Sequence, residues 1–137
     1  MISRFGRVAG TVLCVLMLSA CATRQGSAPV VDHGRNWQSA QLALEQGRQR
    51  YEQGRYEQAL LWLEEALTLG LRNPEDTVEA HKLAAFIACV QSRPGDCRRH
   101  FTELLAIDPD FELARAEVGH PMWGPVFSEV KRSATVR

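Results

Sequence analysis

The feature that most constrains this chain is a pattern of apolar residues that repeats along its middle. Apolar and small residues recur every three or four positions, which is the spacing of one face of an α-helix. Four stretches show this pattern and predict four helices, at residues 37–51, 56–67, 74–91 and 97–107. The first two stretches align with the last two without a gap, 38 residues apart. The sequence therefore predicts an all-α chain containing two copies of a helical hairpin.

The residues that align between the two copies resemble the tetratricopeptide repeat. In that repeat, small residues such as Gly47 let two antiparallel helices approach, and aromatic residues fill the crossing. The matched pairs are Gly47 with Ala85, Tyr51 with Cys89, Ala59 with Cys97, Leu63 with Phe101 and Leu67 with Leu105. The separation exceeds the usual period of about 34 residues, and we expect the extra residues in the loop Gly70–Asn73. An unrelated four-helix bundle is the alternative.

Polar and turn-forming residues mark the predicted helix ends. Asn73 is expected to cap the third helix and Asp96 the fourth, because their side chains can accept hydrogen bonds from free backbone N–H groups. Ser92–Gly95 is the turn between these two helices. The third helix is apolar on all sides over Leu83–Val90, which predicts a central position in the packing.

The segment after the fourth helix is predicted to cover the last hairpin, since two repeats are fewer than the three or so that such an array usually needs. Proline and glycine within 121–125 preclude one continuous helix, so short helical turns are expected at 114–118 and 126–131. Trp123 and Phe127 are predicted to form a structural cap. The alternative is that Trp123 belongs to a partner-binding tail.

The first twenty residues are typical of a signal peptide, with a basic start and an apolar run at Val8–Leu18. Eleven residues at about 1.5 Å each span only half of a bilayer core, so a permanent membrane helix is the poorer interpretation. The run Leu18–Cys21 (LSAC) resembles the lipobox of bacterial lipoproteins. This resemblance implies that the signal is cut before Cys21, which then carries the lipid. An ordinary signal peptide cut nearby is the alternative.

The residue after the lipidated cysteine is alanine rather than aspartate, and the resemblance then implies the outer membrane, on its periplasmic face. The predicted organisation is a signal peptide at 1–20, a lipidated tether at 21–36, a tetratricopeptide-like helical domain at 37–131 and a tail at 132–137. The tether is polar and rich in small residues, and it would span on the order of 20 Å as a coil.

The composition and the absence of known motifs argue against several classes of function. Without residues 1–20, the chain has 14 basic and 16 acidic side chains, and this mildly acidic balance argues against binding to nucleic acid. No nucleophile elbow, phosphate-binding loop or paired-histidine motif occurs. We therefore expect a protein that is not an enzyme and that has no cofactor, metal or small-molecule substrate.

Two cysteines remain after processing, Cys89 and Cys97, and the second hairpin brings them together in a compartment that oxidises thiols. A disulfide is predicted, with a contribution of about 2–3 kcal/mol to stability. Two alternatives are zinc bound by both thiols with His100, with or without His81, for which the spacing is unusual, or two free thiols in the core.

The second half resembles the TssQ-type lipoproteins associated with type VI secretion. The resemblance lies in HKLAAFIAC at His81–Cys89, LAIDPDFEL at Leu105–Leu113 and EVGHPMWGPVF at Glu117–Phe127. It implies an accessory outer-membrane lipoprotein with no enzymatic role. The expected partner is an envelope protein, with the components of a type VI secretion apparatus as candidates.

The inner surface of a tetratricopeptide array is formed by the first helix of each repeat. By that pattern the candidate partner-binding residues are Gln41, Leu44, Arg48, Tyr51, Glu52, Glu79, Lys82 and Phe86, with Trp123 added from the tail. Their mixture of aromatic, aliphatic and charged side chains suits a peptide or helix better than a sugar. A second hypothesis is a pilot or recruiter for other outer-membrane machinery, and a third, less favoured, is a peptidoglycan enzyme.

Overall fold

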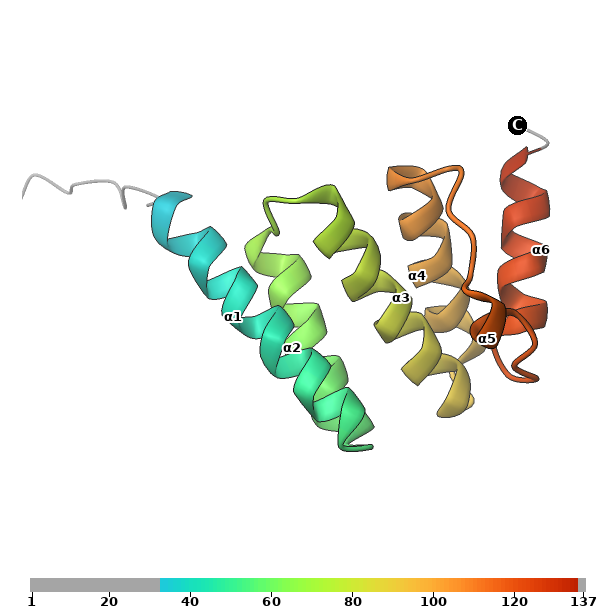
Figure 1. Cartoon of the computed structure of the whole chain (residues 1–137), viewed down its shortest axis with the longest axis horizontal. Helices are drawn as coiled ribbons and strands as arrows, with labels where there is room; N and C mark the ends of the chain where they lie inside the picture. The colour runs from blue at the N-terminus through green and yellow to red at the C-terminus, as the bar shows by residue number, and fades with distance from the viewer. Residues whose placement is uncertain (1–32, 136–137) are drawn as a thin grey trace, which may run out of the picture. The chain divides into compact units, whose positions relative to one another are not determined.

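The computed structural model describes residues 33–135, and this part of the chain contains helices and no strand. The helices are α1 (His33–Glu52), α2 (Tyr56–Leu69), α3 (Pro74–Val90), α4 (Pro94–Ile107), α5 (Arg115–Val118) and α6 (Gly124–Thr135). α1 packs with α2 and α3 with α4 as two hairpins, while α6 packs on α4 (Figure 1). The predicted all-α fold of helical hairpins is confirmed for the described residues.

The first hairpin is built around small and aliphatic side chains. Leu44, Ala59 and Leu63 have no solvent exposure. A Cβ added to Gly47 would lie 2.7 Å from Cδ2 of Leu63, so a larger residue would have to displace α2 or the Leu63 side chain. This is the close approach that the repeat pattern predicted for Gly47.

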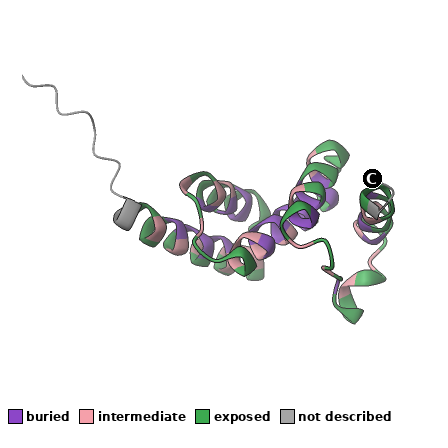
Figure 2. Ribbon diagram, turned by 90° about the horizontal axis from the view of Figure 1, so that it is seen from above, coloured by how far each residue is buried: buried purple, intermediate pink, exposed green. Residues whose placement is uncertain are grey.

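The second hairpin is joined by a disulfide between Cys89 on α3 and Cys97 on α4, whose Cα atoms are 5.1 Å apart. The predicted disulfide is confirmed. Because both sulfurs are used in this bond, the zinc site that combined the two thiols with His100 is excluded. α3 is buried on nearly all sides between Val78 and Cys89 and contacts α1, α2 and α4, as its apolar run predicted (Figure 2).

The chain after α4 covers the second hairpin. Trp123 stacks on Phe86 with ring centroids 4.1 Å apart, and Phe127 meets Phe101 edge-on at 5.2 Å. Both cap residues therefore extend the core that α3 and α4 share. The cap predicted from the aromatic residues of this segment is present.

Several helix ends differ from expectation. α1 begins at His33, inside the stretch expected to be tether, and α6 covers Gly124–Thr135 rather than 126–131. Asn36 and Ser133 are exposed at these ends, so the spacing of apolar residues cannot show that the helices extend this far. The predicted signal peptide, the lipidated Cys21 and most of the tether lie outside the described residues.

The helix caps also differ in detail. Asn73 occupies the cap position of α3, but its side chain makes no cap hydrogen bond and instead donates to Asp76 at 3.4 Å. The cap predicted for Asp96 is wrong, because α4 begins earlier, at Pro94, and Asp96 lies in its first turn. Proline is well suited to that first turn because it needs no N–H partner there.

Candidate protein-interaction surface

α1 and α3, the first helices of the two hairpins, contact each other, and we call the face that they share the inner face. Nε of Arg48 on α1 donates to Glu79 on α3 at 3.0 Å, and Nη2 bonds the same carboxylate and Asp76, the latter at 3.3 Å. The Arg48 side chain is 28% exposed, so these pairs are partly shielded from water. Hydrogen bonding to Glu79 raises the pKa of Arg48, which stays cationic. The network links the first repeat to the second.

Tyr51 lies at the junction of the two repeats. Its half-buried ring packs against the cores of both hairpins and tilts against Tyr56, with centroids 5.6 Å apart. Burial raises the pKa of the Tyr51 hydroxyl, which therefore stays protonated at neutral pH. A substitution here would affect folding as well as the surface.

The segment between α4 and α6 packs against α3 and is held there by Glu117. Lys82 on α3 donates to one Glu117 carboxylate oxygen at 2.9 Å, and the backbone N–H of Ala114 donates to the other at 2.9 Å. The indole N–H of Trp123 donates to the Glu117 carbonyl, also at 2.9 Å. Glu117 thus fixes α5, the cap and α3 relative to one another.

Two of the predicted partner-binding residues are wrong as surface contacts. Leu44 has 0% exposure, because it packs into the core between α1, α2 and α3. Phe86 is 2% exposed, because Trp123 covers it. Trp123 is itself half-buried, because it stacks on Phe86 and on His120.

Two hollows lie along α3, one at its first half and one at its last turns. The first hollow has a volume of about 550 Å³ and is lined by Pro74, Glu75, Val78, Glu79, Lys82, Ile107, Asp108 and Phe111. The second hollow has a volume of about 370 Å³ and is lined by Tyr51, Tyr56, Phe86, Ile87, Val90, His120, Pro121, Met122 and Trp123. The predicted residues are therefore divided between two adjacent depressions rather than gathered in one groove.

The remaining predicted residues, Gln41, Arg48 and Glu52, line neither hollow; Gln41 and Arg48 are half-buried and Glu52 is exposed. The apolar rim of the second hollow was not predicted. Met122 is 43% exposed and Val90 39% exposed there. The sequence feature that could have indicated Met122 is its place in a short segment with prolines on both sides. An apolar side chain in such a segment is not on the buried face of a helix and can remain exposed.

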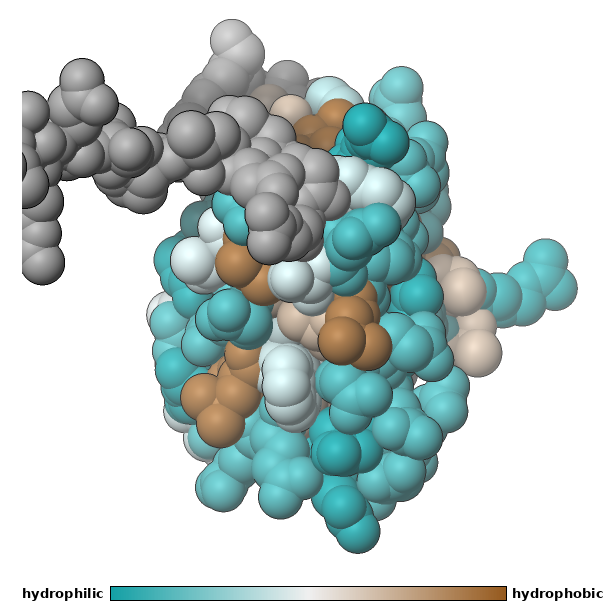
Figure 3. All heavy atoms as spheres, turned by 90° about the vertical axis from the view of Figure 1, so that its left-hand side faces the viewer, coloured by the Kyte–Doolittle hydropathy of each residue, from teal (hydrophilic) through white to brown (hydrophobic). Residues whose placement is uncertain are grey.

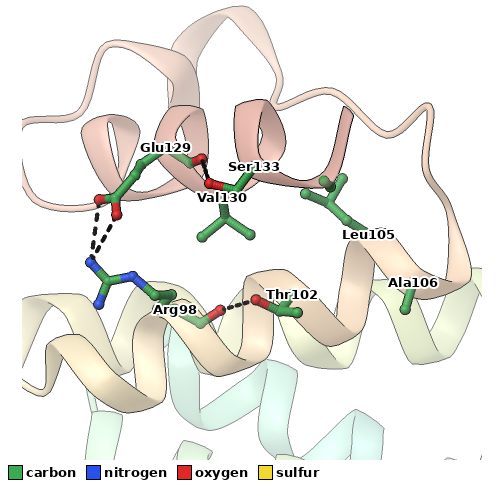
Figure 4. Close-up of a pocket in the computed structure, with 8 residues that line it drawn as sticks. Arg98, Thr102, Leu105, Ala106, Glu129, Val130 and Ser133 are labelled. Atoms are coloured by element: carbon green, nitrogen blue, oxygen red, sulfur yellow. Dashed lines mark hydrogen bonds and ion pairs between the residues drawn. The ribbon is translucent and has the colours of Figure 1, made fainter. Parts of the chain in front are cut away.

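Two other surfaces are notable. The face that α1 and α2 present in Figure 3 shows apolar groups among polar ones, and these helices expose Leu42, Leu61 and Trp62 by 62%, 68% and 40%. A further pocket of about 350 Å³ lies between α4 and α6, where the pair formed by Arg98 and Glu129 closes one side (Figure 4).

Comparison of the chain with models of known protein families, with curated proteins and with solved structures finds no match. Among the helices of residues 33–135, none combines the length and the apolar character needed to cross a membrane.

Proposed function

We propose that this chain is a non-catalytic adaptor that binds a segment of an envelope protein on the inner face of its hairpins. The observation that supports this most is the pair of hollows that lie along α3. One offers Glu79 and Lys82, and the other offers aromatic rings with the exposed Met122. Exposed apolar side chains beside charged groups suit a protein segment better than a small polar ligand.

The proposed place of action is the periplasmic face of the outer membrane, with the chain anchored through Cys21. This part of the proposal rests on the lipobox-like run Leu18–Cys21 and on the apolar run before it. Growth with a palmitate analogue should label the wild-type chain and leave a Cys21→Ser variant unlabelled. Equal labelling of the two chains would contradict the anchor.

We propose further that the bound protein belongs to a type VI secretion apparatus. This rests on the resemblance of residues 81–127 to TssQ-type lipoproteins. The second candidate is a pilot or recruiter for other outer-membrane or peptidoglycan machinery, because a lipid anchor and a small helical domain would serve that task equally.

The test is crosslinking in intact envelopes, followed by affinity capture of the full lipidated chain and mass spectrometry. Two variants make the same chemical change at different places. Met122→Glu introduces a charge at the second hollow, and Leu42→Glu does so on α1, away from both hollows. We expect Met122→Glu to reduce partner recovery at least fivefold and Leu42→Glu to leave it unchanged, with equal melting temperatures.

Recovery of secretion components that depends on Met122 would support both the surface and the apparatus. Recovery of porin-assembly, pilus or murein machinery alone would support the second candidate and refute the secretion assignment. Loss of recovery in Leu42→Glu, with Met122→Glu unaffected, would move the interface to the α1–α2 face. A clearing zone in a peptidoglycan zymogram of the purified chain would overturn the non-catalytic assignment.

A further inference from the structure

Two histidines face each other inside the second hairpin. His81 on α3 is 8% exposed and His100 on α4 is 1% exposed, and they are the buried polar residues of the described core. Their Nδ1 atoms lie 3.1 Å apart. Every other residue that is equally buried in the described part of the chain is apolar or glycine. The two histidines are therefore polar side chains inside a core that otherwise consists of apolar groups.

A carboxylate completes a three-residue cluster with these rings. Glu103 follows His100 by one turn on the same face of α4. Its Oε2 lies 3.3 Å from Nδ1 of His81 and 4.0 Å from Nδ1 of His100. Three potential ligand atoms from two facing helices thus converge on one point.

The size of this triangle matches a metal ion. The three separations place a common centre about 2.1 Å from each atom, which is the length of Zn–N and Zn–O bonds in proteins. Two imidazoles and one carboxylate form a ligand set that zinc accepts, with a fourth position left for water. The Glu103 side chain is 44% exposed, so an ion can enter from its side while His100 closes the other.

We propose that His81, His100 and Glu103 bind a zinc ion through Nδ1 of each imidazole and Oε2 of the carboxylate. The ion ties α3 to α4 at a point distinct from the disulfide. It therefore acts as a second clamp on the hairpin whose α3 helix lines both hollows.

The protonation of the two rings is suited to this role. A metal ligand must be the neutral imidazole, and burial lowers the pKa values of both histidines, that of His100 to about 4. Both rings are consequently uncharged at neutral pH, and the single proton between the two Nδ1 atoms has only to move to Nε2 of its own ring when the ion binds.

Arg99 competes with the ion. Its Nη2 lies 3.1 Å from Nε2 of His100, and its Nη1 donates to Oε2 of Glu103 at 3.4 Å. When Nδ1 binds metal, Nε2 carries the proton and can no longer accept from Arg99. The Arg99 side chain is 46% exposed and has Asp96 within 3.5 Å and Glu64 within 4.0 Å, so other carboxylates can receive it.

The test is Zn²⁺ binding by the full chain, purified in detergent under non-reducing conditions, stripped with EDTA and dialysed. Zn²⁺ is titrated against a chromophoric chelator, and thermal unfolding is followed by circular dichroism with and without Zn²⁺. We expect one bound equivalent and a melting temperature that rises with Zn²⁺ concentration, because the ion binds the folded state.

The variants separate this site from adventitious binding. Glu103→Gln keeps the side-chain size and should weaken Zn²⁺ affinity at least about tenfold. Loss of a residue that only supports a metal ligand already costs about tenfold or more, so loss of a ligand itself should cost no less. Glu64→Gln is the matched control, since Glu64 is 43% exposed, also lies near Arg99 and contacts neither histidine. Arg99→Ala should tighten binding, which a purely structural role for the cluster would not produce.

Absence of saturable binding by the wild-type chain would overturn the proposal. So would equal affinity of Glu103→Gln and Glu64→Gln. The proposal also fails if a His100→Leu variant that still unfolds cooperatively retains wild-type affinity, since the ion would then lie at other histidines.

Discussion

Gly47 is a residue of α1 that lies very close to α2. A Cβ there would lie 2.7 Å from Cδ2 and 3.3 Å from the backbone nitrogen of Leu63, a residue with no exposed surface. The neighbouring atoms are part of a packed core, and cores respond to an added methyl group with shifts of side chains and backbone. The resemblance to the tetratricopeptide repeat identified this position, because in that repeat a small residue here lets two antiparallel helices approach.

Gly47→Ala should therefore lower the free energy of unfolding by about 1–3 kcal/mol, because strain from overpacking exceeds the helix propensity gained. Gly95→Ala is the matched control, since a Cβ at Gly95 meets no atom within 4 Å and the residue lies in the first turn of α4. The control should leave stability unchanged or raise it by up to about 1 kcal/mol. Urea denaturation followed by circular dichroism measures both, and equal effects of the two substitutions would contradict the close approach.

His100 gives the metal-free protein a pH dependence whose sign is defined. Burial, together with the positive charge of Arg99, lowers the pKa of His100 from 6.5 to about 4. Between those values the unfolded chain binds a proton that the folded chain does not. Stability is thus complete above pH 6.5, falls as the pH drops, and levels off near pH 4 as far as this group is concerned.

The total loss from His100 should be about 3 kcal/mol, at 1.36 kcal/mol for each unit of pKa difference. Urea unfolding in EDTA at pH values between 7.5 and 4 measures it. His100→Leu should remove most of the slope between pH 6.5 and 5, where carboxylates contribute little. A wild-type stability that does not change over that interval would show that the buried ring is free to accept a proton.

At the scale of secondary-structure elements, the cap is the part of the fold that combines the most distant contacts. Glu117 holds α5 on Lys82 of α3, and Trp123 donates its indole N–H to the Glu117 carbonyl while stacking on Phe86. The aromatic ring replaces the next hairpin that a longer helical array would place there. The segment after α4 thus closes the core and also contributes residues to both hollows.

Trp123→Ala should lower the free energy of unfolding by about 2–4 kcal/mol, somewhat below the cost of truncating a fully buried tryptophan because Trp123 is half-buried. Val118→Ala is the control on α5, where the valine is 52% exposed, and should change stability by less than about 0.5 kcal/mol. Thermal and urea unfolding of both variants measure these changes in stability. A stable Trp123→Ala protein that loses only partner capture would mean that this tryptophan is a binding residue rather than a cap.

How far the sequence predicts this protein depends on whether a feature is local. The four long helices, the hairpin pairing and the Cys89–Cys97 bridge follow from periodicity and turn residues, and the structure contains them. The inner-face residues were predicted only in part, because Phe86 is covered by Trp123, which lies 37 positions further along the chain. Helical spacing reports which face a side chain occupies, but not which distant segment will cover that face.

The pairing of His81 with His100 illustrates the same limit. The two residues lie on different helices, and their spacing matches no metal-binding motif. Only the packing of α3 on α4 brings the two Nδ1 atoms and the Glu103 carboxylate together. A site of this kind is found from distances rather than from a sequence pattern.

At the scale of the whole molecule, the described chain is two hairpins that depend on a cap for closure. The cores of the two hairpins share Tyr51, and the Arg48–Glu79 pair crosses the junction between them. On the second hairpin, Phe101 and Phe86 are buried at 0% and 2% because the cap lies on them. Removing the cap would expose this aromatic surface, and arrays of this kind need a closing element to stay soluble and folded.

A chain that stops after Ile107 should therefore lose cooperative unfolding and self-associate, while a chain that stops after Thr135 should behave as the full chain does. The first truncation removes Trp123 and Phe127, and with them the rings that cover Phe86 and Phe101. Both truncations keep the two hairpins and the disulfide, so a difference between them reports on the cap alone. Size-exclusion chromatography and thermal unfolding by circular dichroism are the measurements. If the shorter chain were monomeric and unfolded in one sharp transition, the two hairpins would be sufficient by themselves, and the segment after α4 would be available for partner binding.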